Sequence, residues 1–452
     1  MKLNLYLFIL AVISTVSVYA TKPNIDLSIL DLDITDKINE SKCKVNKLIS
    51  CQVQYNQCFL KNVLNIKKCI EEFKSCIVKK CKSEDLNSFE PNKDNVKILG
   101  RAIYQNGYLW FGMTDSGVEY TFNGKTTTIS VTADTASFSE DNPAYIAIYA
   151  DDEVYEKTLI KEKDTDFTVN FDKKGKHTVT FIKLSESERG SLRINEIKAD
   201  VKKIIPTPEK KKKIEFLGDS ITCAYGIDGT GSDTFSTTIQ DGSKSYAYLT
   251  AKKFDADYSI VAHSGICIFK NVPFNGDDTP FVLPPLYDKL GLTMGPNIYD
   301  DGVFFLQETT WDFKQYEPDL IVINLGTNDD YYFLFIDESL IDSEKSAFIQ
   351  SYEDFITYLR NIYPNAEILC TLGMMGQALY PEIEQAVNNY TTKTGDSHVH
   401  SFKFSVQDAE KNGLGADGHP NAKSHLIATQ ELVDEIEKLY GWKSDPNVKI
   451  DE

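Results

Sequence analysis

Residues Lys213 to Gly226 read K-I-E-F-L-G-D-S-I-T-C-A-Y-G, a pattern that predicts a strand, a tight turn and the start of a helix. The apolar run Ile214–Leu217 is typical of a buried strand, and it ends at Gly218-Asp219-Ser220. A serine between a parallel strand and a helix lies where open α/β sheets bind ligands, and where helix-end amides favour negative charge. Taken alone, however, Gly-Asp-Ser is more typical of a turn with an N-capping serine.

After this stretch the sequence alternates between apolar runs and helical patterns. Strands are predicted at 214–217, 258–262, 320–325, 367–372 and 400–404, and helices near 245–254, 344–362, 380–394 and 421–440. The run Leu320–Leu325 is apolar on both faces, as in a parallel sheet covered by helices. Residues 273–311 lack a sustained period and predict a long insertion. We therefore predict an α/β/α domain with a five-stranded parallel sheet over residues 213–442.

In the region before it, residues 96–203, apolar and polar residues alternate with a period of two instead. Short β-rich runs are predicted as strands at 108–112, 118–122, 126–131, 145–149, 167–171, 177–182 and 192–197. Turn signals separate them, for example at Asn123-Gly124 and Lys173–Lys176. Many short strands with regular turns indicate an antiparallel jelly-roll sandwich. This domain either binds carbohydrate or supports the next domain, and we favour support. Polar residues 83–95 and the proline- and lysine-rich residues 204–213 are predicted to be joints.

The first residues indicate export from the cell. Residues 1–20 begin with Lys2, continue as an apolar run and end at Val18-Tyr19-Ala20, which is typical of a secretory signal peptide. A membrane anchor is the alternative, but the apolar run is short. We expect a secreted protein. The formal net charge of −19 argues against nucleic acid or an anionic membrane as the main partner.

Residues 41–82 hold six of the 9 cysteines. In an exported chain, such a cluster predicts a disulfide framework. Cys51 and Cys58 are seven residues apart, as are Cys69 and Cys76, so each set lies on one face of a helix, two turns apart. Two antiparallel helices would place the cysteines of one helix opposite those of the other. We predict a helical hairpin stapled by the pairs Cys43–Cys81, Cys51–Cys76 and Cys58–Cys69. Zinc ligation is the alternative, although paired knuckles are missing. The hairpin would be a spacer or would bind a protein partner.

Polar clusters lie at the ends of the predicted strands or just before the last helix. They are Gly218-Asp219-Ser220, His263-Ser264-Gly265, Gly326-Thr327-Asn328-Asp329 and Asp417-Gly418-His419. All four would meet at the carboxyl edge of one sheet, and their residue types suit acyl transfer. Ser220 can attack a carbonyl if His419 removes its proton. The amides of Ser220 and Gly265 and the side chain of Asn328 are candidate donors to the oxyanion.

These four blocks, in this order, resemble those of the SGNH (GDSL) hydrolases. Gly100-Arg101 and the run His177–Lys183, followed by Glu186 and Gly190, resemble the N-terminal domain of carbohydrate esterase family 2. The resemblance implies a jelly roll followed by an SGNH domain, and an esterase without a metal or other cofactor that deacetylates plant polysaccharides such as xylan and mannan. The alternatives are a lipase-like GDSL esterase and a non-catalytic carbohydrate-binding protein.

The sequence departs from the family pattern at two places. An arginine that often follows Ser-Gly is replaced by Ile266. The aspartate that many SGNH enzymes place three residues before the histidine is replaced by Ala416, and Asp417 stands two residues before His419. Either Asp417 orients the imidazole, or a backbone carbonyl does so and leaves a Ser-His dyad. We favour Asp417.

The remaining candidates are aromatic side chains and three cysteines outside the N-terminal cluster. A sugar-stacking wall is predicted from Tyr225, Trp311, Tyr331 and Tyr332. Cys223 and Cys267 either pair with each other or remain thiols, and Cys370 is predicted to be a free core thiol.

Overall fold

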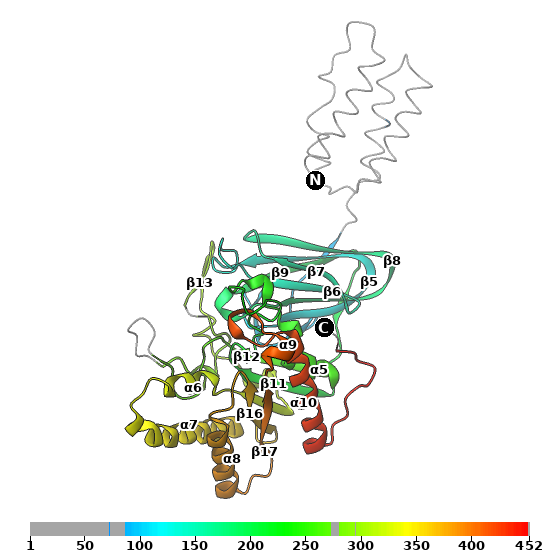
Figure 1. Cartoon of the computed structure of the whole chain (residues 1–452). Helices are drawn as coiled ribbons and strands as arrows, with labels where there is room; N and C mark the ends of the chain where they lie inside the picture. The colour runs from blue at the N-terminus through cyan, green and yellow to red at the C-terminus, as the bar shows by residue number, and fades with distance from the viewer. Residues whose placement is uncertain (1–71, 73–85, 273–279, 294, 451–452) are drawn as a thin grey trace. The chain divides into compact units, whose positions relative to one another are not determined.

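The computed structural model describes residue 72 and residues 86–272, 280–293 and 295–450. Residues from Asn87 onward form one compact unit (Figure 1). The predicted signal peptide and the three disulfides predicted in residues 41–82 lie outside the described residues.

The first part of the compact unit is an antiparallel β-sandwich. Its strands are β1 (Asn87–Phe89), β2 (Lys97–Leu99), β3 (Ala102–Gln105), β4 (Tyr108–Phe111), β5 (Ser116–Ala133), β6 (Tyr145–Ala150), β7 (Glu153–Leu159), β8 (Asp164–Lys183), β9 (Leu192–Ala199) and β10 (Ile204–Pro206). The order β3-β4-β9-β5-β8-β6-β7 forms its main path, with β2 and β10 paired to β5 and β1 paired to β9. The inward-facing apolar side chains of these strands build a core of their own.

Two turns predicted from the sequence are absent, because β5 and β8 run through them as long strands. Asn123 pairs with Lys176 and Gly124 with Gly175, and the register then shifts before Thr126. A Cβ atom on Gly124 would lie 2.1 Å from Asp200 Oδ1, and Lys125 N donates to the same carboxylate. Gly124 therefore lies in a β-bulge that bends the paired strands, and not in a turn.

Both predicted joints contribute strands. β1 lies within residues 83–95 and pairs with β9, while β10 lies within residues 204–213 and pairs with β5. The sandwich therefore extends from Asn87 to Pro206, and the next strand begins at Lys212.

The second part contains a five-stranded parallel sheet, as predicted. Its order is β12-β11-β15-β16-β17, with β11 (Lys212–Gly218), β12 (Ala256–Ala262), β15 (Leu320–Asn324), β16 (Glu367–Met374) and β17 (Val399–Val406). The helices are α5 (Tyr246–Lys253), α6 (Thr327–Phe333), α7 (Ile341–Ile362), α8 (Tyr380–Thr394), α9 (Ala409–Asn412) and α10 (Ala422–Tyr440). The predicted insertion contains the hairpin of β13 (Asn297–Tyr299) and β14 (Gly302–Phe304).

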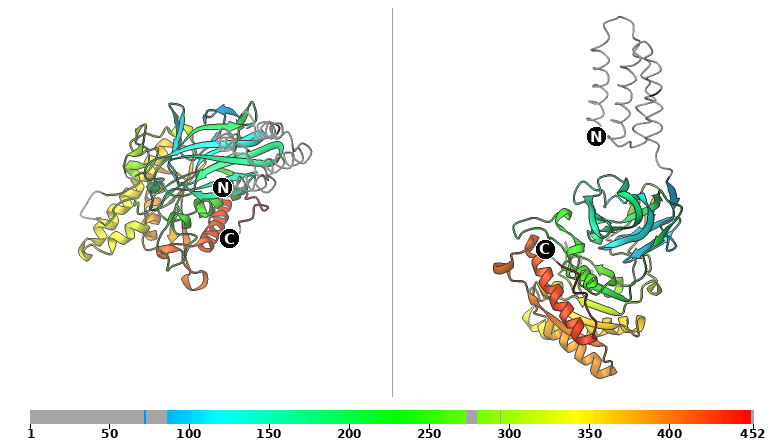
Figure 2. Two further views of the ribbon diagram at one scale, coloured as in Figure 1. Left: turned by 90° about the horizontal axis from the view of Figure 1, so that it is seen from above. Right: turned by 90° about the vertical axis from the view of Figure 1, so that its right-hand side faces the viewer.

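Alternate residues of the central strands pack on opposite faces of this sheet. Phe216 and Val322 contact the layer of α5 and α10, whereas Leu217 and Ile323 contact the layer of α7 and α8. The two helical layers lie on opposite sides in both views (Figures 1 and 2). Burial on both faces explains why the sequence of these strands is mostly apolar.

A buried ion pair joins the sandwich to β11 of the parallel sheet. The side chain of Arg101 is fully buried, and its Nη2 lies 3.2 Å from Glu215 Oε1. Arg101 Nη1 also donates to the carbonyls of Tyr287 and Lys289. Glu215 accepts a further hydrogen bond from Ser259 Oγ at 3.0 Å. The guanidinium thus contacts the insertion as well as the sheet.

Candidate active site

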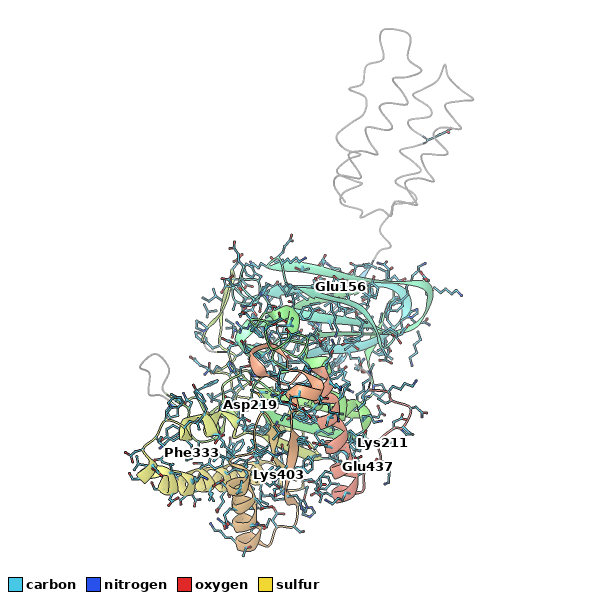
Figure 3. The ribbon with its side chains drawn as sticks, viewed as in Figure 1. Glu156, Lys211, Asp219, Phe333, Lys403 and Glu437 are labelled. Carbon is cyan, nitrogen blue, oxygen red and sulfur yellow. The ribbon has the colours of Figure 1, made fainter. Side chains whose placement is uncertain are left out.

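Ser220 lies in the turn that follows β11, at the carboxyl edge of the parallel sheet. Figure 3 labels its neighbour Asp219, which lies on the side of the sheet that faces the sandwich. A Cβ atom on Gly218 would lie 2.0 Å from Thr222 Oγ1, so the strand can turn this sharply only with glycine at that position. Ser220 itself is 8% exposed.

His419 contacts Ser220 directly. Its Nε2 lies 2.9 Å from Ser220 Oγ, and its Nδ1 lies 3.3 Å from the carbonyl oxygen of Ala416. A carbonyl can only accept, so Nδ1 carries the proton and Nε2 is left to accept one from the serine. The structure thus brings together the nucleophile and base candidates that the sequence placed 199 residues apart.

The prediction that the Asp417 carboxylate orients His419 is wrong in this structure. The carboxylate accepts a hydrogen bond from Tyr225 Oη at 2.9 Å instead. Asp417 has left-handed backbone angles, φ 51° and ψ 31°. This conformation directs the Asp417 side chain to Tyr225, and the carbonyl of the preceding Ala416 takes the place beside the imidazole. The geometry is that of a Ser-His dyad.

Burial lowers the pKa of His419 below its usual value. The Ala416 carbonyl and the charge of Asp417 oppose this shift without cancelling it. Tyr225 covers the imidazole, with ring centroids 4.4 Å apart, and itself stacks on Phe235 at 4.2 Å. The histidine is therefore neutral at pH 7, which is the form a general base requires.

Two buried carboxyl groups organise the loops around the serine. Asp219 accepts the amide of Ile221 at 3.0 Å, and burial raises the pKa of Asp219 to about 7. Asp329 accepts three amides in a row, from Ile268, Phe269 and Lys270. Burial raises the pKa of Asp329 to about 6, although these amides lower it. Asp329 therefore ties the third block of the motif to the loop that follows the second.

The three oxyanion-hole candidates lie in the loops that these carboxyl groups hold. Asn328 Nδ2 donates to the Ile266 carbonyl at 3.0 Å and to Asp219 Oδ2 at 3.3 Å, so both of its N–H groups have partners before substrate binds. The amides of Ser220 and Gly265 donate no hydrogen bond to any other described residue. Gly265 has φ +80°, and a Cβ atom there would meet nothing within 4 Å. Gly265 therefore borders open space, where its amide can meet a substrate oxygen.

The predicted aromatic wall is only partly assembled. Tyr225 lies against His419, but Trp311 is 4% exposed and packs in a buried cluster with Trp110, so the prediction of a sugar-facing role for Trp311 is wrong. Tyr331 is 56% exposed and lies one helical turn after Asn328 on α6. Tyr332 donates to Glu344 at 3.1 Å. Phe235, which stacks on Tyr225, was not predicted, because the sequence around it has no motif.

Cys223, Cys267 and Cys370 are all buried free thiols. Cys223 and Cys267 therefore do not pair with each other, which was one of the two alternatives.

Among the described residues, no group of three or more His, Cys, Asp or Glu side chains is arranged to hold a metal ion. None of the helices in that part of the chain has the length and apolar character needed to cross a membrane.

Comparison with known families matches both parts of the compact unit. Residues 214–432 match the GDSL-like lipase/acylhydrolase family, and residues 98–208 match the carbohydrate esterase 2 N-terminal family. This chain contains a GDSL-like lipase/acylhydrolase domain preceded by a carbohydrate esterase 2 N-terminal domain. The family resemblance of the sequence is thereby confirmed.

Three similar proteins illustrate this resemblance to the GDSL-like hydrolases. The cellulase/esterase CelE of Acetivibrio thermocellus is 32% identical to this chain, and the match covers 59% of this chain and 31% of that larger protein. An acetylxylan esterase / glucomannan deacetylase of Cellvibrio japonicus is 26% identical over 77% of this chain and 90% of its own length. The solved structure of an acetyl xylan esterase from the rumen bacterium Butyrivibrio proteoclasticus has a TM-score of 0.69 and 26% identity, and the match covers 79% of this chain and 100% of that chain.

Proposed function

We propose that this chain is a secreted serine O-acetylesterase that removes acetyl groups from plant cell-wall polysaccharides of the xylan or mannan type. The observation that carries the proposal is the 2.9 Å contact between Ser220 Oγ and His419 Nε2. Beside it, the amides of Ser220 and Gly265 donate no hydrogen bond to another described residue. The names of the Cellvibrio and Butyrivibrio relatives support the substrate class.

In the proposed mechanism, His419 Nε2 accepts the hydroxyl proton while Ser220 Oγ attacks the acetyl carbonyl. The oxyanion of the tetrahedral intermediate is held by the amides of Ser220 and Gly265 and by Asn328 Nδ2. The intermediate then collapses: the bond between the acetyl carbon and the sugar oxygen breaks, His419 gives its proton to that oxygen, and acetyl-Ser220 remains. A water molecule, deprotonated by His419, releases acetate in the same way. Throughout, the Ala416 carbonyl holds Nδ1 and the proton it carries.

Substrate contacts are proposed for the exposed aromatic side chains near this site. Tyr331 and Phe335 are 56% and 63% exposed, and their ring centroids lie 4.9 Å apart. Tyr331 follows Asn328 on α6 and Phe335 lies two residues after the end of that helix, so a polysaccharide whose acetyl group reaches Ser220 can stack its neighbouring sugar units on them. Tyr225 would border the acetyl group. Tyr332, whose ring lies edge-on to Phe269 and Phe333, would contact the sugar chain beside them.

The deciding experiment measures acetate release from acetylated xylan and acetylated glucomannan by the wild type and by Ser220→Ala. We expect release by the wild type and a loss of at least about 10⁴-fold in the variant, because the nucleophile is gone. Full activity of Ser220→Ala on 4-nitrophenyl acetate would reject the proposal. The ratio of the two polysaccharide rates identifies the preferred backbone.

A lipase-like esterase is the second candidate. Leu334 and Phe335 directly follow α6 and are 70% and 63% exposed; they favour it because long acyl chains need apolar surface. A series of 4-nitrophenyl esters from acetate to octanoate separates the two functions. For an acetylesterase, kcat/KM falls steeply once the acyl chain exceeds four carbons. For a lipase-like enzyme, kcat/KM rises with the length of the acyl chain.

Secretion is proposed from residues 1–20, whose pattern is that of a signal peptide. N-terminal sequencing of protein recovered from the medium of an expressing host tests this, and a first residue near Thr21 is expected.

A further inference from the structure

Glu186 is a sandwich residue whose side chain enters the hydrolase part. Glu186 follows β8 and is fully buried. Its carboxylate accepts hydrogen bonds from the backbone N–H and the hydroxyl of Ser264. Ser264 N lies 2.7 Å from Oε2 and Ser264 Oγ lies 2.8 Å from Oε1. Gln240 Nε2 donates to Oε1 at 3.1 Å. Burial alone would raise the pKa of Glu186, but the charge of His263 and these hydrogen bonds bring it below its usual value.

The other side of the Ser264 backbone is fixed as well. His263 Nδ1 donates to the Ser264 carbonyl at 2.7 Å. This carbonyl and the N–H of Gly265 belong to the same peptide unit, which is trans, so the two groups point in opposite directions. Holding the carbonyl on His263 therefore turns the Gly265 N–H away from it. That N–H is one of the two oxyanion donor candidates that donate no hydrogen bond to another described residue.

The turn that carries Glu186 is held rigid by a buried lysine. Lys183 is fully buried at the end of β8, and its ammonium donates to the carbonyls of Gly112, Ser185 and Glu186 at 3.1, 2.8 and 2.5 Å. One cation thus gathers three carbonyls around itself, and the Glu186 backbone is one of them.

Gln240 connects Glu186 to the turn of the nucleophile. Its Oε1 accepts the amide of Glu186 at 3.3 Å, and its Nε2 donates to the Cys223 carbonyl at 3.3 Å. The Glu186 side chain therefore contacts the Ser264-Gly265 loop directly and the Ser220 turn through one side chain.

We propose that Glu186 is a positioning residue for the esterase reaction, which presets the Ser264–Gly265 peptide so that the Gly265 N–H points at the oxyanion. This inference rests on the proposed function, because it assumes acyl transfer at Ser220. The sandwich then contributes to the rate of the reaction, in addition to supporting the fold.

The test is Glu186→Gln in the full chain. A glutamine has one accepting oxygen, and its amino group would face a donor of Ser264, so the loop loses at least one of its two anchors. We expect kcat on 4-nitrophenyl acetate to fall by about 10²- to 10³-fold, the cost of losing one oxyanion donor, with KM within about threefold. Inhibition by phenylboronic acid, which forms a tetrahedral adduct on Ser220, should weaken in proportion.

A matched control is Asp134→Asn. Asp134 is also a buried sandwich residue with a carboxylate. It accepts hydrogen bonds from the backbone N–H and the hydroxyl of Ser191 and from the side chain of Asn297 in the insertion. It does not contact Ser264, so Asp134→Asn should lower the thermal midpoint and leave kcat and boronate inhibition unchanged.

Ser264→Ala covers the case in which Glu186→Gln does not fold. This variant removes one hydroxyl and keeps the bond from Ser264 N to Glu186, so a smaller fall in kcat in the same direction is expected. Unchanged kcat in the folded variants, or a fall in kcat with unchanged boronate inhibition, overturns the inference alone. A wild type without esterase activity overturns the proposed function instead.

Discussion

His419 has to accept a proton in each half of the proposed reaction, so the pKa of its imidazole sets the acid limit of activity. Burial lowers this pKa below the usual 6.5. We therefore expect kcat/KM to stay level as the pH falls through 6.5 and to decline only below it, because the protonated imidazole cannot act as a base. A pH profile of kcat/KM on 4-nitrophenyl acetate checks this. An acid limb centred above pH 6.5 would contradict the burial argument.

Asp417→Asn separates a dyad from a triad. Since the Ala416 carbonyl holds His419 Nδ1, we expect kcat to fall by less than about 10-fold, against roughly 10⁴-fold where an aspartate holds the correct tautomer. The charge of Asp417 raises the pKa of His419, so the acid limb should also move to lower pH. Tyr225→Phe, which removes the partner of Asp417, is the matched control and should leave kcat close to that of the wild type.

At this scale the sequence predicted the nucleophile and base candidates but not the partner of the histidine. Ser220, Asn328 and His419 each stand in a short motif, and their types alone suggest acyl transfer. The direction of the Asp417 side chain depends on its left-handed backbone, and a spacing of two residues before the histidine does not reveal that angle.

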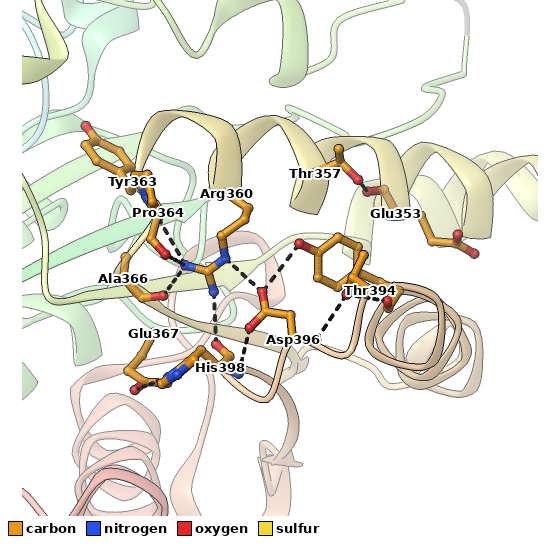
Figure 4. Close-up of polar contacts among 11 residues, drawn as sticks. Glu353, Thr357, Arg360, Tyr363, Pro364, Ala366, Glu367, Thr394, Asp396 and His398 are labelled. Carbon is orange, nitrogen blue, oxygen red and sulfur yellow. Dashed lines mark hydrogen bonds and ion pairs between the residues drawn. The ribbon is translucent and has the colours of Figure 1, made fainter.

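At the scale of elements, α7 ends in a cluster of hydrogen bonds around Arg360 (Figure 4). Arg360 Nε lies 2.8 Å from Asp396 Oδ2, and Nη1 donates to the carbonyls of Tyr363 and Ala366 at 3.0 and 2.6 Å. We expect Arg360→Lys to lower the free energy of unfolding by about 1–3 kcal/mol, because an ammonium cannot reach both the carboxylate and the carbonyls. Urea unfolding measures the change.

Two observations make the Arg360 prediction specific. The cluster lies at the amino end of β16 and β17, opposite the edge that carries Ser220, so kcat should not change. Lys438→Gln breaks an exposed i,i+3 pair with Glu435 and should leave the unfolding midpoint where it is. A loss of kcat in Arg360→Lys, or equal stability of the two variants, would contradict this account.

Elements of the parallel sheet were predicted well, since each strand is a short segment between helical patterns and Leu320–Ile323 of β15 is apolar throughout. α6 was missed because its first turn, Thr327-Asn328-Asp329-Asp330, is polar and short and therefore resembles a loop. In the sandwich, Asn123-Gly124 has the composition of a hairpin turn. The bulge formed there depends on the paired strand β8, which local sequence does not reveal.

At the scale of the whole molecule, the Arg101–Glu215 pair is the buried charge contact between the sandwich and β11. Arg101→Met leaves the Glu215 carboxylate buried without its cation, and we expect a loss of about 3–5 kcal/mol in the free energy of unfolding. The double variant Arg101→Met/Glu215→Gln should recover part of that loss, because the unpaired charge is gone. Equal stability of the single and double variants in chemical denaturation would contradict this.

Such contacts between domains could not be predicted from the sequence, although the residues that make them had been noted. Arg101 and Glu186 stood out only through family resemblance, and their partners lie 114 and 78 residues away. Pairing over that distance depends on the packing of two complete domains, and no local pattern encodes it.

The way Glu186 enters the hydrolase part limits how such a gene can be reshuffled. The connection between Pro206 and Lys212 is short and looks like a convenient recombination point. A chimaera joined there would inherit a complete parallel sheet with its serine and histidine, yet the carboxylate that holds Ser264 would come from the other parent. We therefore expect that hybrids remain active only when the donor sandwich supplies counterparts of Arg101, Lys183 and Glu186, so the two coding segments must be inherited together.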